Sequence, residues 1–302
     1  MKAVMLHEYG SSDKLKLEEI PDPVAGEGEV LVRVAAASVN PVDWKMRSGE
    51  AKGHFPVEFP GILGRDCSGT VRAVGAGVVG FEPGDQVFAL TSKTYAELCV
   101  VKAADLAKVP PGLDLVRAAA LPLVTLTGEQ LIRLGTGIQA GQTVLITGAL
   151  GGVGRAAVWA AQFVGAKVIV GVRKKHLAEA KLLKAQAVVA LDDKEAMAGV
   201  GMVDAVADAV GGPTAEMLMA KVKPGGVFAS VLGPPANAAL NPTVRVVPVM
   251  AKPDPTRMVA MAEAVVRGEF DIPIDRMIAL EYAGAGQDAA AGGGIGKVLL
   301  LA

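Results

Sequence analysis

A glycine-rich stretch in the middle of the chain has the residue types and spacing needed to hold a pyrophosphate group. Its four glycines lie between an apolar run at 143–147 and small and apolar residues at helical spacing over 156–164. Strand, glycine turn and helix together let backbone N–H groups at the helix start bind phosphate, where side chains would block the ligand. Any tight strand-to-helix connection can use glycines, so the turn alone does not identify a pyrophosphate site. The sequence after the turn must supply further evidence. The turn itself is Gly148-Ala149-Leu150-Gly151-Gly152-Val153-Gly154.

Three consecutive cations follow the next predicted strand, and they favour NADPH over NADH. The apolar run at 167–172 ends in Arg173-Lys174-Lys175, where an NAD-binding domain usually carries an acid for the ribose 2′-hydroxyl. No acid occurs at the strand end or in these three positions. The cations would neutralise a 2′-phosphate, and Arg173 could bind it with its planar fork. The alternative is a solvated basic start to a helix at 176–184, but next to the glycine turn we favour the cofactor role.

The elements around these motifs predict an α/β fold with a doubly wound parallel sheet of six strands. Strand-like and helix-like segments alternate from residue 143 onward, as in the two βαβ halves of a dinucleotide-binding Rossmann domain. We place this domain at residues 123–255. The predicted strands are 143–147, 167–172, 187–191, 203–208, 226–232 and a sixth near 244–249. The predicted helices between them are 153–164, 175–184, 194–199 and 213–222.

Two loops that follow predicted strands should also face the cofactor. Ligands of doubly wound sheets bind beyond the carboxyl ends of the strands. We therefore expect Val210 and Gly211 in one loop, and Leu232 and Gly233 in the other, to lie beside the nicotinamide half of the cofactor.

The two ends of the chain should form a second, β-rich domain. Short apolar runs separated by Gly- and Pro-containing turns over the first 120 residues are typical of a barrel-like domain. A closing strand at 296–301 is expected to complete a sheet begun elsewhere. The Ala- and Gly-rich segment at 283–294 before it is short and could form a mobile loop. We assign residues 1–122 and 256–302 to this domain.

Composition limits the partners and the compartment. The chain has 302 residues, a net charge of −1 and only strand-sized apolar runs, so neither nucleic acid nor a membrane is an expected partner. Two cysteines cannot form a disulfide framework, and the first ten residues lack the apolar core of a secretory signal. These features lead us to expect a cytoplasmic protein.

The order of short motifs along the chain resembles that of the medium-chain dehydrogenase/reductase superfamily, and within it the zinc-free quinone oxidoreductase branch. The resemblance implies a GroES-like barrel domain together with the Rossmann domain. It also implies hydride transfer from NADPH to a quinone or to the activated double bond of an α,β-unsaturated carbonyl. The matching motifs span residues 38–43, 63–69, 84–87, 95–97, 119–122, 148–154 and 296–298.

The resemblance raises the question of zinc, because related zinc alcohol dehydrogenases bind a catalytic metal through a cysteine, a Gly-His-Glu motif and a later cysteine. Those positions hold Asn40, Gly64-Arg65-Asp66 and approximately Leu123 in this chain. Asn, Arg and Leu side chains cannot supply the thiolate, imidazole or carboxylate donors that zinc requires. The three histidines match no ligand spacing, so we expect no metal.

Five polar residues carry the candidate roles that the resemblance implies, and each has a structural alternative. Asn40 would lie at the nicotinamide side of the active-site cleft, or would cap the helix after it. Asp43 would orient a neighbour, or would be a first-turn acid favoured by the helix dipole. Lys45 would stabilise a developing enolate or relay a proton, or would be an exposed helix lysine. Thr127, at the start of the helix leading into the nucleotide domain, and Lys297 would lie beside the cofactor, or would serve as a cap and a structural lysine.

The sequence alone leaves alternative functions and the oligomeric state undetermined. A non-catalytic NADPH-binding or redox-sensing protein and an enoyl-thioester reductase are alternatives to the quinone or enone reductase. Neither the acceptor nor the proton donor can be named. The strand near 244–249 should lie at the sheet edge, where unprotected strands invite pairing. Because relatives dimerise through this region, we expect a homodimer there.

Overall fold

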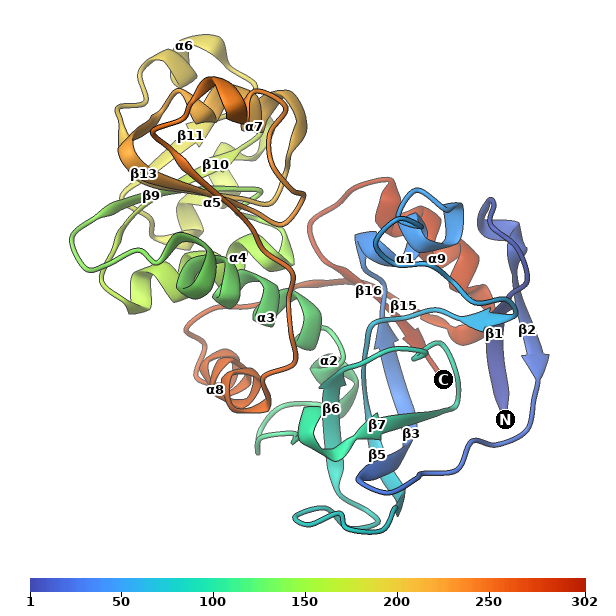
Figure 1. The fold of residues 1–302 in the computed structure, drawn as a ribbon. Helices are drawn as coiled ribbons and strands as arrows, with labels where there is room; N and C mark the ends of the chain where they lie inside the picture. Colours follow the sequence, from blue (N-terminus) through green and yellow to red (C-terminus); the bar gives the residue numbers. More distant parts are fainter. The chain divides into compact units, whose positions relative to one another are not determined.

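The computed structural model describes residues 1–302, and the chain forms two compact units (Figure 1). The first unit is built from both ends of the chain and the second from its middle. None of the helices combines the length and the apolar run required to span a membrane. The first unit contains Met1–Leu123, Pro253–Gly268 and Ile272–Ala302, and the second contains Val124–Lys252 and Glu269–Asp271.

Two sheets form the first unit, with strand orders β2-β1-β4 and β15-β16-β3-β5-β6-β8, and β7 pairs with β3. This is the β-rich, GroES-like part of the predicted fold. Its strands are β1 (Lys2–Leu6), β2 (Leu15–Glu19), β3 (Glu29–Ser38), β4 (Gly61–Ile62), β5 (Asp66–Val74), β6 (Gln86–Leu90), β7 (Leu98–Lys102), β8 (Leu106–Lys108), β15 (Ile274–Ala279) and β16 (Lys297–Leu301). Its helices are α1 (Pro41–Ser48), α2 (Leu115–Ala118), α8 (Pro255–Val266) and α9 (Ala283–Ala291), with 3-10 turns η1 (Ser12–Lys14), η2 (Ala103–Asp105) and η7 (Leu280–Tyr282).

Strand β16 returns to the N-terminal sheet, as the sequence predicted. It pairs antiparallel with β3, Leu299 opposite Ser38, and parallel with β15, so that the blue and red ends of the chain lie side by side in Figure 1. The apolar side chains Val30, Val32 and Val34 of β3 are buried in the core of this unit. Their burial fixes the register of β3 and therefore the position of the residues that follow it.

The second unit is built on one parallel sheet of six strands in the order β11-β10-β9-β12-β13-β14. All five strand pairs are parallel, which confirms the predicted doubly wound sheet. The order reverses between β9 and β12, the neighbours at the switch point where such sheets bind ligands. The strands are β9 (Thr143–Thr147), β10 (Lys167–Val172), β11 (Ala187–Ala190), β12 (Val203–Asp208), β13 (Val222–Ser230) and β14 (Arg245–Pro248).

Helices pack against this sheet, and two of them differ from the prediction. The helix predicted at 175–184 is divided into three short pieces, and the one at 213–222 ends at Met219 because Val222 already belongs to β13. The helices are α3 (Pro122–Gln130), which continues into the π-helical η3 (Leu131–Thr136), α4 (Gly152–Phe163), α5 (Leu177–Ala180) between η4 (Lys174–His176) and η5 (Lys181–Leu183), α6 (Lys194–Ala198) and α7 (Gly212–Met219), with the 3-10 turn η6 (Ala238–Leu240).

Two assignments near the C-terminal end of the chain need correction. The segment expected to be a loop at 283–294 begins with helix α9, because alanine favours helix and Gly286 packs closely under the side chains of Ile278 and Leu300. The segment Glu269–Asp271, which the sequence placed with the β-rich domain, belongs to the second unit. There Phe270 packs on Trp159 at a ring distance of 5.5 Å, and Trp159 Nε1 donates to Glu269 at 2.9 Å.

Candidate active site

The glycine turn between β9 and α4 is closed to side chains at its most crowded position. Gly148 has a φ of +60°, in the left-handed region, and Gly151 is the N-cap of α4. A Cβ on Gly154 would lie 2.1 Å from the carbonyl oxygen of Gly148 and 2.6 Å from Cα of Ala149. The turn can therefore fold tightly over the helix start only with glycine at this position. The unpaired N–H groups of the first helical turn remain for an anion.

Asp208 organises the carboxyl ends of three neighbouring strands beside this turn. It ends β12 and is fully buried, and its carboxylate accepts hydrogen bonds from Thr147 on β9 and Ser230 on β13, each at 2.8 Å. The backbone N–H groups of Val210 and Gly211 donate to the same carboxylate at 3.1 Å. One buried side chain thus holds the strand ends and the loop after β12 together.

The two loops predicted to face a cofactor lie against the glycine turn and against each other. A Cβ on Gly148 would meet Cγ2 of Val210 at 3.2 Å, and a Cβ on Gly211 would meet Cδ1 of Leu232 at 2.8 Å. Gly211 and Gly233 have φ values of +73° and +89°. The side chains of Val210 and Leu232 are 46% and 50% exposed, so they form an apolar surface at the carboxyl edge of the sheet.

The three predicted cations directly after β10 are exposed, but they are not equivalent. Lys174 Nζ forms an ion pair with Asp193 at 2.8 Å, and this hydrogen bond raises the pKa of Lys174. The backbone N–H of Lys174 donates to Asp192 at 2.7 Å. Because Lys174 is already paired, Arg173 and Lys175 carry the charge that remains for a phosphate.

A buried polar cluster in the first unit begins where β3 ends. The Asp66 carboxylate, at the start of β5, accepts hydrogen bonds from Ser38 Oγ at 2.7 Å, from Asn40 Nδ2 at 3.0 Å and from the Leu123 N–H at 3.2 Å. Asn40 Oδ1 accepts from Lys297 Nζ at 2.6 Å, and the same ammonium donates to the carbonyl oxygen of Val39 at 2.7 Å. Asn40 is fully buried and Lys297 is 7% exposed. The amide of Asn40 therefore connects a buried cation to a buried carboxylate.

Asp43 extends the cluster on the other side of Asn40. Asp43 Oδ2 accepts hydrogen bonds from the backbone N–H of Asn40 at 2.8 Å and from the Tyr95 hydroxyl at 3.0 Å, whereas Oδ1 is buried with no partner. The N–H of Asp43 itself bonds to the backbone carbonyl of Asn40. Asn40 is the N-cap residue of α1, and the Asp43 carboxylate bonds back to its N–H as in a capping box, while the Asn40 amide is engaged by Lys297 and Asp66.

Burial dominates the ionisation of this cluster. It raises the pKa of Asp43 from 3.8 to about 7 and raises the pKa of Asp66, while the hydrogen bonds that each carboxylate accepts act in the opposite direction. Burial lowers the pKa of Lys297, and the charges of Asp66 and Asp43 partly restore it. Burial and the neighbouring Asp43 raise the pKa of Tyr95 well above its usual value. The cluster thus buries one lysine and two acidic side chains away from water, and the ionisation of each depends on the charges of the others.

Comparison with known proteins agrees with this geometry. Residues 26–111 match the family described as alcohol dehydrogenase GroES-like domain, and residues 183–300 match the family described as zinc-binding dehydrogenase. Acryloyl-coenzyme A reductase of Sulfurisphaera tokodaii is 34% identical over 246 residues, which are 71% of each chain. The chain belongs to the medium-chain dehydrogenase/reductase superfamily.

Within this superfamily the chain falls in the quinone oxidoreductase branch. Human quinone oxidoreductase is 36% identical over 174 residues, and the match spans 52% of that relative's length. The solved quinone oxidoreductase of Coxiella burnetii has a TM-score of 0.88 at 26% identity, covering 100% of this chain and 99% of that one. Mycobacterial Rv1454c, solved in complex with NADPH, has a TM-score of 0.86 at 28% identity, with 100% of both chains covered.

The positions that hold zinc ligands in dehydrogenases of this superfamily meet around Asp66. Asn40 and the Leu123 N–H bond to its carboxylate, and Arg65 precedes it in the chain. Asp66 is the one metal-binding side chain type among them, and its oxygens are occupied by protein hydrogen bonds. The structure contains no group of three or more His, Cys, Asp or Glu residues that could hold a metal ion. The donor set therefore does not fit zinc.

Two further candidates are Lys45 and Thr127. Lys45 Nζ forms an ion pair with Glu50 at 3.1 Å on the surface of the first unit, which favours its structural role. Thr127 is buried inside α3, which begins at Pro122, so it does not cap the helix start. Sequence reasoning missed the roles of Asp208, which ends a predicted strand, and Asp66, which was considered only as a metal ligand.

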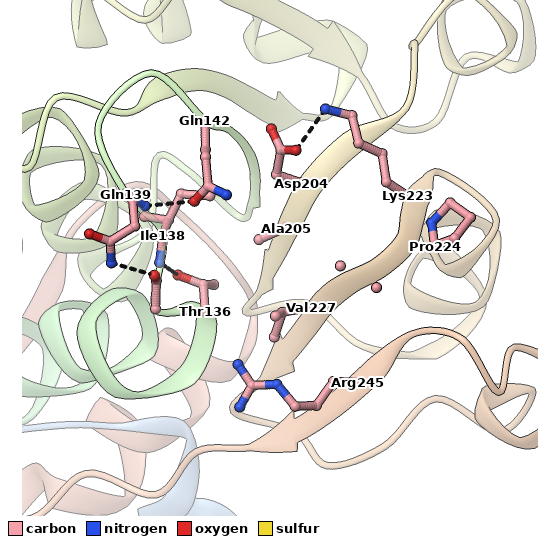
Figure 2. Close-up of a pocket in the computed structure, with 13 residues that line it drawn as sticks. Thr136, Ile138, Gln139, Gln142, Asp204, Ala205, Lys223, Pro224, Val227 and Arg245 are labelled. Carbon is pink, nitrogen blue, oxygen red and sulfur yellow. Dashed lines mark hydrogen bonds and ion pairs between the residues drawn. The ribbon is translucent and has the colours of Figure 1, made fainter.

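A separate cavity of about 310 Å³ lies at the opposite edge of the parallel sheet (Figure 2). Its wall carries the ion pair between Lys223 and Asp204, at 2.6 Å, and the exposed Arg245. The Asp204 carboxylate also accepts from the Thr143 N–H at 2.7 Å. Because β9 and β12 begin here, the cavity lies at the amino ends of the strands, away from the glycine turn.

Proposed function

We propose that this oxidoreductase is a zinc-independent reductase that uses NADPH to reduce a quinone or the activated double bond of an α,β-unsaturated carbonyl. The observation that carries the proposal is the glycine turn, which has the tight form that leaves the start of α4 open to a pyrophosphate. A Cβ at Gly154 would lie only 2.1 Å from the backbone carbonyl oxygen of Gly148. NADPH supplies hydride when bound. Quinones and enones accept hydride without a Lewis acid, since delocalisation stabilises the anion that forms, and this suits a site whose donor set does not fit zinc.

Residues of the second unit would hold NADPH. The N–H groups at the start of α4 would bind the pyrophosphate, and the exposed Arg173 and Lys175 would bind the 2′-phosphate. The apolar side chains of Val210 and Leu232 would pack on the nicotinamide half. The mycobacterial neighbour was solved in complex with NADPH, which supports the same nucleotide for this chain.

Binding measurements with glycine variants test the turn. Gly154→Ala should weaken NADPH binding by about tenfold or more, because the added carbon forces the turn open at a cost of roughly 1.4 kcal/mol or more in binding free energy. Gly201→Ala is the matched control in the same unit, since a Cβ there has no neighbour within 4 Å. Equal affinities for the two variants, measured by fluorescence titration, would contradict the assignment.

Nucleotide preference tests the basic residues. Arg173→Ala should raise the KM for NADPH by about tenfold while the KM for NADH stays constant, because only NADPH carries the 2′-phosphate. Lys181→Ala removes another exposed lysine of the second unit and should change neither constant. A wild-type protein that prefers NADH would refute the role of the triplet.

An enoyl-thioester reductase is the second candidate, and it rests on the similarity to acryloyl-coenzyme A reductase over 71% of the chain. A spectrophotometric screen of NADPH oxidation with simple quinones, alkenals, cyclic enones and enoyl-CoA thioesters separates the two. Higher kcat/KM with the thioesters would select the second candidate. NADPH binding without oxidation by any acceptor would instead indicate a non-catalytic NADPH-binding or redox-sensing protein.

A further inference from the structure

The cavity at the amino ends of the parallel strands is built around an irregularity in the sheet (Figure 2). Strand β13 carries extra residues at 223–226, and this segment stands opposite Asp204 of β12 alone. Such bulges interrupt a strand ladder and commonly re-aim side chains beside functional sites. All residues that line the cavity belong to the second unit, so the site is complete within one compact body.

Two glycines of this bulge are required by its geometry. Gly225 has a φ of +79°, in the left-handed region, and its N–H donates to the carbonyl oxygen of Thr243 at 2.8 Å. A Cβ on Gly226 would lie 2.6 Å from the carbonyl oxygen of Asp204, whereas a Cβ on Gly225 would meet no heavy atom within 4 Å. The cavity floor is therefore bare backbone held in one conformation, with open space beside Gly225.

The charged side chains of the cavity wall leave one positive charge uncompensated. Lys223 and Asp204 form an ion pair at 2.6 Å, and the hydrogen bond from Lys223 holds the pKa of Asp204 below its usual value. Both groups therefore stay charged and cancel each other. Arg245 lines the same cavity, but its side chain forms neither an ion pair nor a hydrogen bond with the protein. Its charge is permanent, because guanidinium stays protonated.

Strand pairing places Arg245 at the cavity. It stands opposite Val227 on β13, and Val227 stands opposite Ala205 on β12. Directly paired residues share a face of the sheet, so Arg245 lies in one row with two apolar residues that also line the cavity. Pairing of β14 with a second copy would use its free backbone edge, so the dimer expected there leaves this face of the sheet open.

The turn between η3 and β9 forms the other side of the cavity (Figure 2). Gln142 Oε1 accepts a hydrogen bond from the backbone N–H of Gln139 at 2.8 Å, and Gln139 Nε2 donates to the carbonyl oxygen of Gly137 at 2.8 Å. These bonds hold the turn and leave Nε2 of Gln142 available as a donor. The buried Ile138 of the same turn adds an apolar surface.

We propose that this cavity binds a small organic monocarboxylate, whose carboxylate lies on the fork of Arg245 and whose hydroxyl or carbonyl oxygen accepts from Gln142 Nε2. A guanidinium matches a carboxylate in bidentate geometry. One uncompensated cation balances one carboxylate, whereas Asp204 repels the second charge of a dicarboxylate or a phosphate dianion. The volume of about 310 Å³ is near the lower limit of ligand pockets and admits only a small molecule. This site does not depend on the proposed reductase function.

Calorimetric titration with lactate, malonate and inorganic phosphate at pH 8 tests the charge argument. Lactate carries one carboxylate and one hydroxyl, malonate carries two carboxylates, and phosphate is mostly a dianion at this pH. Lactate should bind more tightly than either of the others by about fivefold or more, because only lactate matches the single free cation. Tighter binding of malonate or phosphate would overturn the assignment to a monocarboxylate.

Arginine variants test the position of the site. Arg245→Ala should weaken lactate binding by about tenfold, and Arg245→Lys, which keeps the charge but not the fork, should lose less. Arg245 is exposed and bonds to no other side chain, so both variants should fold, which circular dichroism checks. Arg173→Ala is the matched control, because it removes another exposed arginine of the same unit and should keep wild-type lactate affinity. Unchanged affinity in Arg245→Ala would refute the site.

NADPH provides a further test, because the cavity and the nucleotide loops lie at opposite ends of β12. Asp204 lines the cavity near the start of this strand, and Asp208 ends it at the loop of Val210 and Gly211. Lactate affinity should therefore be equal with and without saturating NADPH. Competition between the two would place the anion at the nucleotide site and overturn the proposal. A protein that binds lactate through Arg245 but does not bind NADPH would refute the proposed reductase function and leave the carboxylate site standing.

Discussion

Replacing Asp43 by asparagine should remove a pH dependence of stability that the buried cluster imposes. Burial raises the pKa of Asp43 from 3.8 to about 7 in the folded protein. The folded state therefore holds a proton that the unfolded state has released across the interval between these values. Since the folded state binds more protons there, stability falls as pH rises through that interval.

The size of the effect follows from the pKa shift. One pKa unit corresponds to about 1.36 kcal/mol, so the shift amounts to about 4 kcal/mol in total. About 2.6 kcal/mol of this falls between pH 5 and pH 8, where the folded protein loses its extra proton. Asp66, Lys297 and Tyr95 face the same carboxyl group and titrate as well. The difference in the free energy of unfolding between wild type and Asp43→Asn isolates the Asp43 contribution. The amide of the variant keeps an oxygen that can accept hydrogen bonds from Asn40 and Tyr95.

Urea unfolding from pH 5 to pH 8 provides the measurement. Trp44 packs against the core of the first unit, so a Trp159→Phe background, which leaves Trp44 as the only tryptophan, reports on that unit. The free energy of unfolding of Asp43→Asn minus that of wild type should grow by about 2.6 kcal/mol across the range. Asp85→Asn is the control in the same unit, since its pKa lies below 3.8 and the difference in unfolding free energy from wild type should stay constant over this range. Parallel curves for wild type and Asp43→Asn would refute the reasoning.

Three other predictions concern the cation, the metal and the assembly. Lys297→Met should destabilise the first unit by about 3–5 kcal/mol, because it removes the one cation of the buried cluster that contains the Asp66 carboxylate, whereas the same change at the exposed Lys102 should cost little in urea unfolding. Metal analysis of purified protein should find no stoichiometric zinc; tightly bound zinc would contradict the interpretation of the donor set. The protein should sediment as a dimer, and Val247→Lys on the edge strand β14 should shift it toward monomer; an unchanged dimer would locate the interface elsewhere.

Local features of the fold could be predicted from the sequence because neighbouring residues determine them. The turn from Gly148 to Gly154 and the strands on either side follow from glycine geometry and from runs of apolar residues a few positions apart. The same applies to the cations after β10, although the ion pair of Lys174 with Asp193 depends on where β11 ends, which the sequence does not specify.

The buried cluster could not be predicted, because its members come from distant parts of the chain. Lys297 is 257 residues away from Asn40, and only the pairing of β16 with β3 brings the ammonium to the amide. From the sequence alone, where that pairing is unknown, Asn40 can be interpreted as a helix cap and Lys297 as a structural lysine. Arg65 shows a different difficulty: its residue type excluded zinc, but its lack of a protein partner is visible only once Phe55 is placed over it.

The origin of the first unit from both ends of the chain has a consequence for biosynthesis. As the chain leaves the ribosome, Asn40, Asp43 and Asp66 emerge early, while their cation at Lys297 follows only after the whole central sheet has been made. Until then β3 lacks β16 as a neighbour, and burial of Asp43 and Asp66 is not compensated by the Lys297 ammonium. The parallel sheet can form in the meantime, since domains generally fold as units during synthesis. The first unit is therefore completed only after the central sheet has been synthesised.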